Sequence, residues 1–280
     1  MSTLTGRIAI VTGAGSGMGS ESARLLAETG ATVVVVGRRE KPLQEVVDAI
    51  RFAGGTAHLC VADIAAPGAA HELIHWVHDN VGLVDILVNN AGSSSAVLNP
   101  QWMPEEQWRQ VVDVNLTAVF ALTQAVLPDM LNRQTGTIVT VSSLAALTPN
   151  LLGGAAYGAA KAAVRNFMTF LHATYRNEGL RAITILPGEA DTPILDNRAR
   201  PPAPAERANM VQPIDVARAI QLAVSLPQRT VLQEIVVAPT RQRDTSGDLE
   251  ISRWLGAPNE VAPTNRSTRT TATVEEGNAK

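Results

Sequence analysis

The sequence predicts an α/β fold in which helices cover both faces of a parallel β-sheet. Short apolar segments alternate with helical patterns along the 280 residues, which is typical of consecutive βαβ units. Several apolar segments are almost continuous in Val, Ile and Leu, as expected of parallel strands buried on both faces. The first segment leads directly into a glycine-rich turn and a helix. Together these features predict a doubly wound, three-layer α/β/α domain.

The individual elements follow from the hydrophobic periodicity. The expected strands are Arg7–Val11, Thr32–Val36, Ala57–Val61, Asp85–Val88, Thr137–Val141, Arg181–Leu186 and Glu234–Val237. The expected helices are Gly17–Thr29, Leu43–Phe52, His71–Val81, Glu105–Asn132, Ala155–Glu178 and Ile214–Ser225. Pro128 is expected to kink or end the longest helix, because proline cannot donate a backbone hydrogen bond.

The chain divides into one domain and an extension. Residues 1–240 are expected to form the domain. Residues 241–280 are expected to be a largely disordered C-terminal extension, because large apolar side chains are scarce in its last part. Residues 191–212 are rich in Pro, Ala and Arg and have no clear period. A loop of this length inside a compact domain is usually functional, so we expect a lid.

Composition and charge exclude several classes of partner. The chain is 45% hydrophobic and 18% charged, which suits a packed core. Its net charge of −3 gives no basic field for nucleic acid or an anionic membrane. Cys60 is the only cysteine, so a reducing compartment is expected. No apolar run approaches the roughly 20 residues that span a membrane, and the N-terminus does not resemble a signal peptide. A cytoplasmic protein is therefore predicted.

The first expected strand ends in a glycine-rich turn with the sequence TGAGSGMG, Thr12–Gly19. Glycines allow a tight turn whose backbone N–H groups approach a pyrophosphate, and the N-terminus of the next helix adds partial positive charge. The spacing is T-G-x-x-x-G-x-G, because Met18 stands where G-x-G-x-x-G requires its third glycine. Strand, turn and helix in this order predict a Rossmann-type dinucleotide site.

Further motifs follow this turn in order along the chain. They are Asp63 after the third expected strand, NNAG at Asn89–Gly92, Asn115 within DVNL, Ser143 at the end of VTVSS, Tyr157 and Lys161 as Y-x-x-x-K, Pro187-Gly188, and Thr192. On these motifs, over about residues 5–240, the chain resembles the short-chain dehydrogenase/reductase family. The resemblance implies a seven-stranded parallel Rossmann sheet in the order 3-2-1-4-5-6-7.

The resemblance also implies a role for each matching position. Gly13, Gly17 and Gly19 would shape the pyrophosphate turn, Asp63 would contact the adenine ring, and the NNAG turn would support the cofactor and the central sheet. The end of the sixth strand and Thr192 would hold the nicotinamide carboxamide. The implied cofactor contacts are Gly13, Ser16, Gly17, Met18, Gly19, Arg38, Asp63, Ile64, Asn89, Ala91, Gly92, Tyr157, Lys161, Pro187, Gly188 and Thr192.

Tyr157 is the candidate acid/base for exchange between an alcohol and a carbonyl. Hydride transfer to a carbonyl leaves an alkoxide-like oxygen that needs a proton, and alcohol oxidation needs a base. The ordinary tyrosine pKa of about 10 is too high for a base near neutrality. Lys161 lies one helical turn further on the same face, so its ammonium can stabilise the phenolate. Ser143 would orient the substrate oxygen, and Asn115 would bridge Lys161 to solvent through a water.

The end of the second expected strand favours NADP(H) over NAD(H). An acidic residue at this place usually holds the adenosine ribose hydroxyls and repels a 2′-phosphate. Here Gly37 stands about where that residue would be, and Arg38 follows with a guanidinium that suits a phosphate oxygen. The alternative is NAD(H), with Arg38 and Arg39 as solvated residues at a helix entry, and Ser16 in the glycine turn is not basic.

One motif indicates a different chemistry. The segment His71–His75 reads H-E-x-x-H, the pattern of zinc-protease helices. The apolar stripe of this helix points elsewhere, and no G-x-x-H follows His75. A solvated polar face is therefore predicted, without a metal site, and a zinc hydrolase is the least favoured alternative.

The predicted function is that of an NAD(P)(H)-dependent oxidoreductase that interconverts an alcohol and a ketone or aldehyde. Leucines between Ser143 and Tyr157 suggest a rather apolar small-molecule substrate. The resemblance implies a homodimer or homotetramer, formed through the helices that begin near Glu105 and Ala155. The main alternative is a non-catalytic dinucleotide-binding redox sensor or scaffold, against which the Ser-Tyr-Lys set argues.

Overall fold

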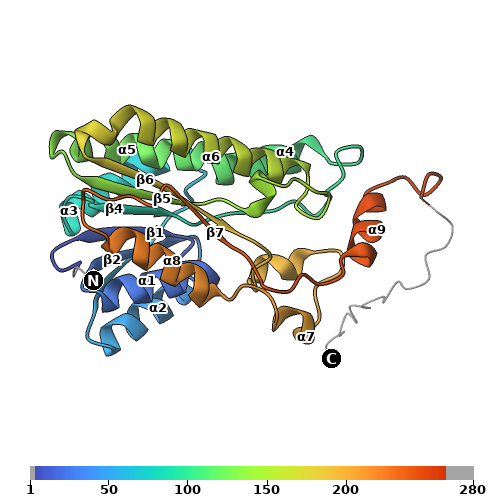
Figure 1. Cartoon of the computed structure of the whole chain (residues 1–280), viewed down its shortest axis with the longest axis horizontal. Helices are drawn as coiled ribbons and strands as arrows, with labels where there is room; N and C mark the ends of the chain where they lie inside the picture. Colours follow the sequence, from blue (N-terminus) through green and yellow to red (C-terminus); the bar gives the residue numbers. More distant parts are fainter. Residues whose placement is uncertain (1–3, 263–280) are drawn as a thin grey trace, which may run out of the picture.

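The computed structural model describes residues 4–262, whose strands form a seven-stranded parallel sheet between two layers of helices (Figure 1). The strand order is β3-β2-β1-β4-β5-β6-β7, as expected. The strands are β1 (Ile8–Thr12), β2 (Thr32–Gly37), β3 (Thr56–Val61), β4 (Ile86–Asn89), β5 (Gly136–Val141), β6 (Leu180–Pro187) and β7 (Glu234–Val237). Every expected strand is present, with its ends within one residue of the predicted ones. The predicted three-layer α/β/α Rossmann fold is thereby confirmed.

Each face of the sheet packs against its own set of helices. One face is covered by α1 (Gly17–Glu28), α2 (Glu40–Phe52) and α8 (Pro213–Ser225), and the other by α3 (Ala69–Asn80), α5 (Ala118–Asn132) and α6 (Ala155–Tyr175). Burial on both faces explains the run of four valines in β2. Val33 and Val35 pack on the first set of helices and Val34 and Val36 on the second, and all four are fully buried.

The long helix predicted over 105–132 has its irregularity at a different place from the one expected. It consists of α4 (Glu105–Val112), a π-helical turn at Asp113–Thr117, and α5, which continues through Pro128 to its end. Gln124, whose carbonyl loses its donor to the proline, is exposed to water. By length and composition alone this stretch could cross a membrane. It packs on α3, β4 and β5, which accounts for its apolar character.

The predicted lid and the extension contain more helix than expected. The lid has a 3-10 segment at Pro193–Asn197 and the short helix α7 (Pro204–Arg207). Its base is closed by backbone hydrogen bonds, from Asp191 N to Val211 O at 2.9 Å and from Val211 N to Glu189 O at 3.1 Å. In the extension, the helix α9 (Ser246–Trp254) differs from the disorder expected over those residues. The rest of that predicted tail, 263–280, lies outside the described residues.

Candidate active site

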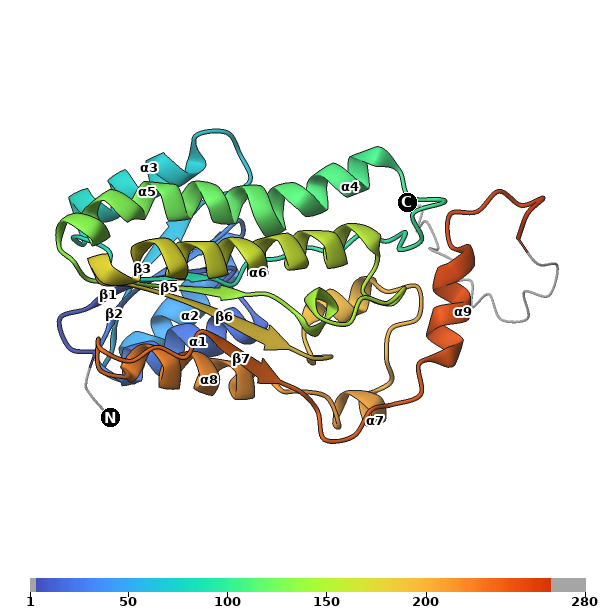
Figure 2. The same cartoon turned by 45° about the horizontal axis from the view of Figure 1, so that its top comes forward.

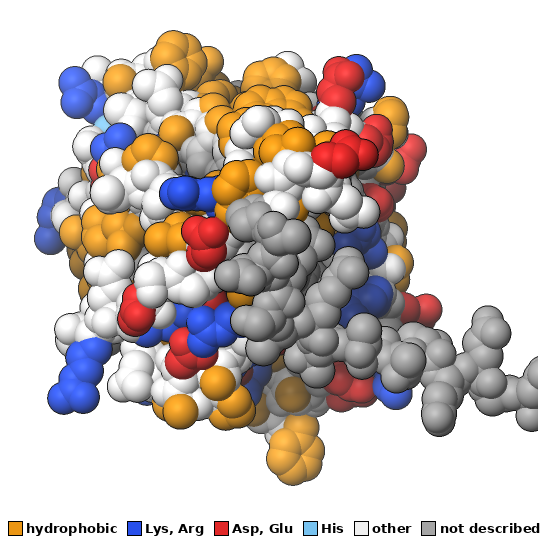
Figure 3. All heavy atoms as spheres, turned by 90° about the vertical axis from the view of Figure 1, so that its right-hand side faces the viewer, with side chains coloured by type: hydrophobic (Ala, Val, Ile, Leu, Met, Phe, Trp, Pro, Cys, Tyr) orange, Lys and Arg blue, Asp and Glu red, His pale blue; other side chains and the backbone are white. Residues whose placement is uncertain are grey.

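The candidate site residues gather at the carboxyl edge of the sheet. The glycine turn follows β1, Arg38 follows β2, Asp63 follows β3, the NNAG turn includes the end of β4, and Ser143 follows β5. The strand arrows in Figure 2 point toward this edge, beside which the lid and α9 lie. Figure 3 views the protein from the same side, where basic and acidic side chains are interspersed with apolar ones.

The glycine turn is tightly fitted against the NNAG turn. Gly13 has φ +65°, and a Cβ on it would lie 2.9 Å from Ala91 Cα. A Cβ on Gly19 would lie 2.4 Å from Gly13 O. Thr12 Oγ1 accepts hydrogen bonds from the backbone N–H groups of Asn90 and Ala91, each at 3.1 Å, and Asn90 Nδ2 donates to Thr12 O at 2.9 Å. The two turns therefore form one rigid unit.

The sequence prediction missed Asn90 in this unit. The side chain of Asn89 instead lies inside the sheet, where Nδ2 donates to Thr140 Oγ1 at 3.4 Å. Adjacent side chains on a strand point to opposite faces, so only one asparagine of the pair can face the turn. The register of β4 against β1, which pairs Val11 with Val88, determines which one does so.

The start of α1 fits a diphosphate group. Ser16 precedes the helix without forming a side-chain cap, and the first turn contains no acidic residue. The first backbone N–H groups therefore have no partner within the helix and face the turn with partial positive charge. Thr192 lies beside them, because a Cβ on Gly17 would be 3.5 Å from Thr192 Cγ2. The glycine turn and the start of the lid thus border the same site.

The end of β2 presents two arginines. Arg38 and Arg39 are exposed, and within residues 4–262 their side chains form no hydrogen bond or ion pair. Asp63 lies at the neighbouring strand end, since the preceding Ala62 donates its N–H to Gly37 O at 2.9 Å. The Asp63 carboxylate accepts a hydrogen bond from Ala65 N at 3.1 Å. An adenosine bound at this edge would have the Asp63 carboxylate on one side and the guanidinium groups of Arg38 and Arg39 on the other.

The turn after β6 is closely packed as well. Gly188 donates its N–H to Val237 O at 2.8 Å, and a Cβ on it would lie 2.9 Å from Pro239 Cδ. Ile64 and Met18, two further implied cofactor contacts, are half-buried against the core. The backbone on both sides of the expected cofactor position is therefore fixed by packing and main-chain hydrogen bonds.

Lys161 is enclosed next to Tyr157 on α6. Its side chain is nearly buried, and Nζ donates to Val141 O at 2.8 Å. Ser142 Oγ donates to Lys161 O at 2.8 Å, so the helix is tied to the end of β5. The Lys161 Nζ atom lies 5.5 Å from the centre of the Tyr157 ring. Burial lowers the pKa of Lys161 to about 8.

Burial and neighbouring groups shift the pKa of Tyr157 in opposite directions. Part of the side chain reaches the surface, but the hydroxyl lies in the interior, and burial raises the pKa of Tyr157. A hydrogen bond with Ser143 and the positive charge of Arg198 act in the lowering direction. Ser143 Oγ also accepts a hydrogen bond from Ala145 N at 3.1 Å, which orients it at the end of β5. Arg198, in the lid, was not among the residues predicted from the sequence.

Asn115 occupies the π-helical turn between α4 and α5 and is fully buried. Its Nδ2 donates to Val111 O and Ser93 O, both at 2.8 Å, while Oδ1 has no hydrogen-bond partner within residues 4–262. A Cβ on Gly92 would lie 3.0 Å from this Oδ1 and 3.7 Å from Lys161 Nζ. An unpaired buried acceptor and an ammonium thus border the same space.

The histidine motif on α3 does not assemble a ligand set. His75 Nε2 lies 3.3 Å from Asp79 and His78 Nε2 lies 3.1 Å from Asp129, so the two rings face different carboxylates. In the described part of the chain, no three His, Cys, Asp or Glu side chains are grouped to hold a metal ion.

Comparison with known proteins identifies the family of the chain. The profile of the family described as short chain dehydrogenase matches residues 7–202. The chain belongs to this short-chain dehydrogenase family. Relatives include uncharacterised oxidoreductases of Listeria innocua, 32% identical over 86% of this chain and 99% of the relative, and of Staphylococcus aureus, 32% identical over 85% and 100%.

Solved structures of the family show the same fold. A metagenomic short-chain oxidoreductase in complex with NADP is 30% identical, with a TM-score of 0.75 over 86% of this chain and 100% of the other. A Beutenbergia cavernae protein with NADP bound at low occupancy is 32% identical, with a TM-score of 0.75 over 84% and 96%. The chain is accordingly an oxidoreductase of the short-chain dehydrogenase family, and the predicted family resemblance is confirmed.

Proposed function

We propose that this short-chain dehydrogenase interconverts an alcohol and a ketone or aldehyde with NADP(H), using Tyr157 as the acid/base. The observation that carries the proposal is the cluster of Tyr157, Lys161 and Ser143 at the same edge of the sheet as the glycine turn. A proton-transfer group beside a dinucleotide-binding turn is what carbonyl reduction needs. The NADP complexes of two structural relatives support the choice of cofactor class.

The chain's own residues would hold the substrate oxygen and move one proton. The bound dinucleotide supplies or accepts the hydride. In reduction, the Tyr157 hydroxyl donates its proton to the forming alkoxide while Ser143 donates a hydrogen bond to the same oxygen. Because burial keeps Tyr157 protonated, it suits the donor role directly. In oxidation, the positive charge of Lys161 would have to favour the phenolate.

Asn115 would complete the path by which Tyr157 exchanges its proton with solvent. Its unpaired Oδ1 and Lys161 Nζ border the same space beside Gly92. A water there could accept from the ammonium and donate to the amide oxygen, which would satisfy the buried acceptor. The proposed order of transfer is from solvent through this water to Lys161 and then to Tyr157.

The preference for NADP(H) is proposed to depend on Arg38. Replacing Arg38 with Ala is expected to weaken NADPH binding by about tenfold or more, because a hydrogen bond to a charged group contributes about 1.5–3 kcal/mol. NADH binding is expected to change little. Energy transfer from tryptophan to the nicotinamide during titration measures both dissociation constants. Lys41→Ala, which removes the same charge from a nearby exposed position, is the control. Equal losses for NADPH and NADH in the Arg38 variant would contradict the assignment.

The oligomer is proposed to form through α4, α5 and α6. Trp108, Phe120 and Phe170 on these helices are 41%, 48% and 58% exposed, and the rings of Phe120 and Phe167 lie 5.9 Å apart. Exposed aromatic side chains gathered on neighbouring helices are typical of an interface.

Phe170→Glu is therefore expected to shift a homodimer or homotetramer toward smaller species, because it places a charge in this apolar surface. Sedimentation velocity would measure the shift. Phe52→Glu is the matched control, since Phe52 is 96% exposed and lies on α2, which covers the other face of the sheet. An unchanged sedimentation coefficient for the Phe170 variant would place the interface elsewhere.

The substrate is proposed to be a rather apolar small molecule, and the protein to act in the cytoplasm. Leu144, Leu151 and Leu152 are half-buried between Ser143 and Tyr157, and Leu147 is exposed. An apolar lining with a few polar groups at the reacting atoms is typical of small-molecule sites. Turnover of a panel of ketones and aldehydes with NADPH tests the class.

A further inference from the structure

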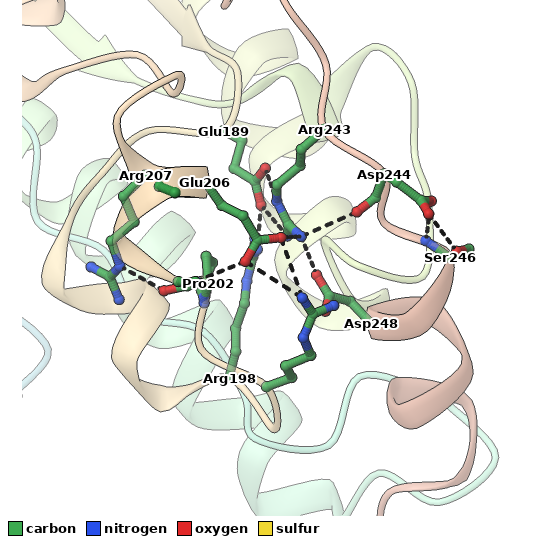
Figure 4. A network of polar contacts seen from close by, with 12 residues as sticks. Glu189, Arg198, Pro202, Glu206, Arg207, Arg243, Asp244, Ser246 and Asp248 are labelled. Carbon is green, nitrogen blue, oxygen red and sulfur yellow. Dashed lines mark hydrogen bonds and ion pairs between the residues drawn. The ribbon is translucent and has the colours of Figure 1, made fainter.

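A network of ion pairs joins the lid to the C-terminal extension, outside the catalytic set (Figure 4). Arg243 lies at its centre. Its Nε and Nη2 atoms donate to the two carboxylate oxygens of Glu189, each at 2.8 Å, and its Nη1 atom lies 2.5 Å from Asp248. The side chain of Arg243 is 9% exposed and that of Asp248 is 3% exposed. Charges withdrawn from water in this way are stable only while they are paired, so these contacts are mutually dependent.

The network continues into the lid itself. Arg200 donates to Asp248 at 2.8 Å and lies 3.3 Å from Glu206, while Arg198 pairs with Glu189. Glu189 therefore holds Arg198 of the lid and Arg243 of the extension at the same time. Asp248 similarly holds Arg200 of the lid and Arg243 of the extension. The bidentate pairing of Arg243 adds a defined orientation to this attachment.

The other end of α9 is attached to the loop that follows β4. Trp102 Nε1 and Asn99 Nδ2 both donate to Arg253 O, at 3.1 Å and 2.8 Å. A Cβ on Gly256 would lie 3.1 Å from the methyl groups of Val97. Helix α9 thus joins two loops that leave the carboxyl edge of the sheet at different strands, and it lies at that edge in both ribbon views (Figures 1 and 2).

The fully buried side chains of α9 are polar, while Leu249 and Trp254 are half-buried. Within the helix the buried residues are Asp248 and Ser252, whereas Ile251 is 44% exposed. An apolar face buried against the domain would hold the helix whatever the state of the lid. Ion pairs and hydrogen bonds to loops hold it only while those loops keep their present positions. The placement of α9 and that of the lid are therefore linked.

We propose that α9 is part of the substrate site, and that Arg243 and Asp248 are positioning residues that hold the lid, with Arg198, beside Tyr157. This inference rests on the proposed function. Within residues 4–262, Lys161 of α6 lies 5.5 Å from the centre of the Tyr157 ring. Burial raises the pKa of Tyr157, and the positive charge of Arg198 from the lid acts in the lowering direction. Loss of the network would act on substrate binding and on proton transfer. Cofactor binding would be spared, because the base of the lid, which carries the expected cofactor contact Thr192, is closed by backbone hydrogen bonds outside this network.

Asp248→Asn tests the inference, with Glu250→Gln as the matched control. Both variants remove one negative charge from α9 and keep the shape of the side chain, but within residues 4–262 the Glu250 side chain bonds only Trp254 of its own helix. In Asp248→Asn, hydrogen exchange of the amides at 194–208 is expected to be at least about tenfold faster than in the wild type. The KM for phenyl alkyl ketones is expected to rise about fivefold or more with a smaller change in kcat. Exchange, KM and kcat in Glu250→Gln should match the wild type, and the dissociation constant of NADPH should be unchanged in both variants.

The pH profile gives a readout that a merely structural role would not move. With Arg198 released, the limb of kcat/KM that reports Tyr157 in alcohol oxidation is expected to move to higher pH, since a positive charge has left the phenol. Trp102→Phe removes the hydrogen bond to Arg253 O together with part of the ring, and it serves as a second variant if Asp248→Asn fails to fold. It is expected to accelerate hydrogen exchange in the lid as well.

Each outcome bears on the inference separately from the proposed function. Unchanged hydrogen exchange of the lid in both Asp248→Asn and Trp102→Phe would overturn the link between α9 and the lid. Faster exchange with unchanged KM and pH profile would overturn the role of α9 in the substrate site. Absence of turnover in the wild type would remove the proposed function, while the exchange comparison would still decide whether α9 holds the lid.

Discussion

Tyr157→Phe is expected to lower kcat/KM for carbonyl reduction by about 10²–10⁴-fold, the usual contribution of a general acid. The substitution removes the hydroxyl that would protonate the forming alkoxide and leaves the ring beside Lys161 in place. NADPH binding is expected to stay close to that of the wild type. Oxidation of NADPH in the presence of a ketone measures the rate, and tryptophan-to-nicotinamide energy transfer measures binding.

Tyr175→Phe is the control for this experiment. Tyr175 is the only other tyrosine and lies at the far end of the same helix. An equal loss in both variants would indicate a general effect on α6 and would remove the special role of Tyr157. Tight NADPH binding by a wild type that turns over no alcohol or carbonyl would favour the redox-sensor alternative instead.

The fold was predictable because its signals are local. Strands such as β2, with four consecutive valines, are buried on both faces and therefore need no partner to be recognised. The glycine turn was predictable for a similar reason, since its chemistry depends on neighbours within eight positions of the chain. The right-handed βαβ connection then leaves few ways to order the strands.

The parts that were not predicted depend on contacts between distant residues. Asn90 reaches Thr12 across 78 positions because β1 and β4 are neighbours in the sheet. The pairing of Arg243 with Glu189 spans 54 positions and joins two polar segments that carry no periodic pattern. Asn115 in the π-helical turn likewise bonds to Ser93, 22 positions earlier. Patterns in a single sequence do not record contacts between residues that are far apart along the chain.

Gly19→Ala is expected to weaken NADPH binding by about 10- to 100-fold, corresponding to the roughly 1–3 kcal/mol that overpacking usually costs. The new methyl group would lie 2.4 Å from Gly13 O and 2.5 Å from Asn90 Nδ2. Both neighbours are polar atoms of the rigid unit formed by the two turns, so neither can move without displacing N–H groups that would face the diphosphate. Titration with NADPH measures the loss.

A second glycine in a helix separates this effect from a general cost of the substitution. Gly158→Ala adds the same methyl group within α6, where the nearest atom outside the helix is Ala145 O at 3.8 Å, an ordinary contact. Alanine also favours helix over glycine by about 1 kcal/mol, so both variants should gain intrinsic helix stability. If Gly19→Ala then loses NADPH affinity and Gly158→Ala does not, the loss arises at the turn. Equal affinities in the two variants would show that the glycine turn adapts, and the tight fit at Gly19 would then not be what binds the dinucleotide.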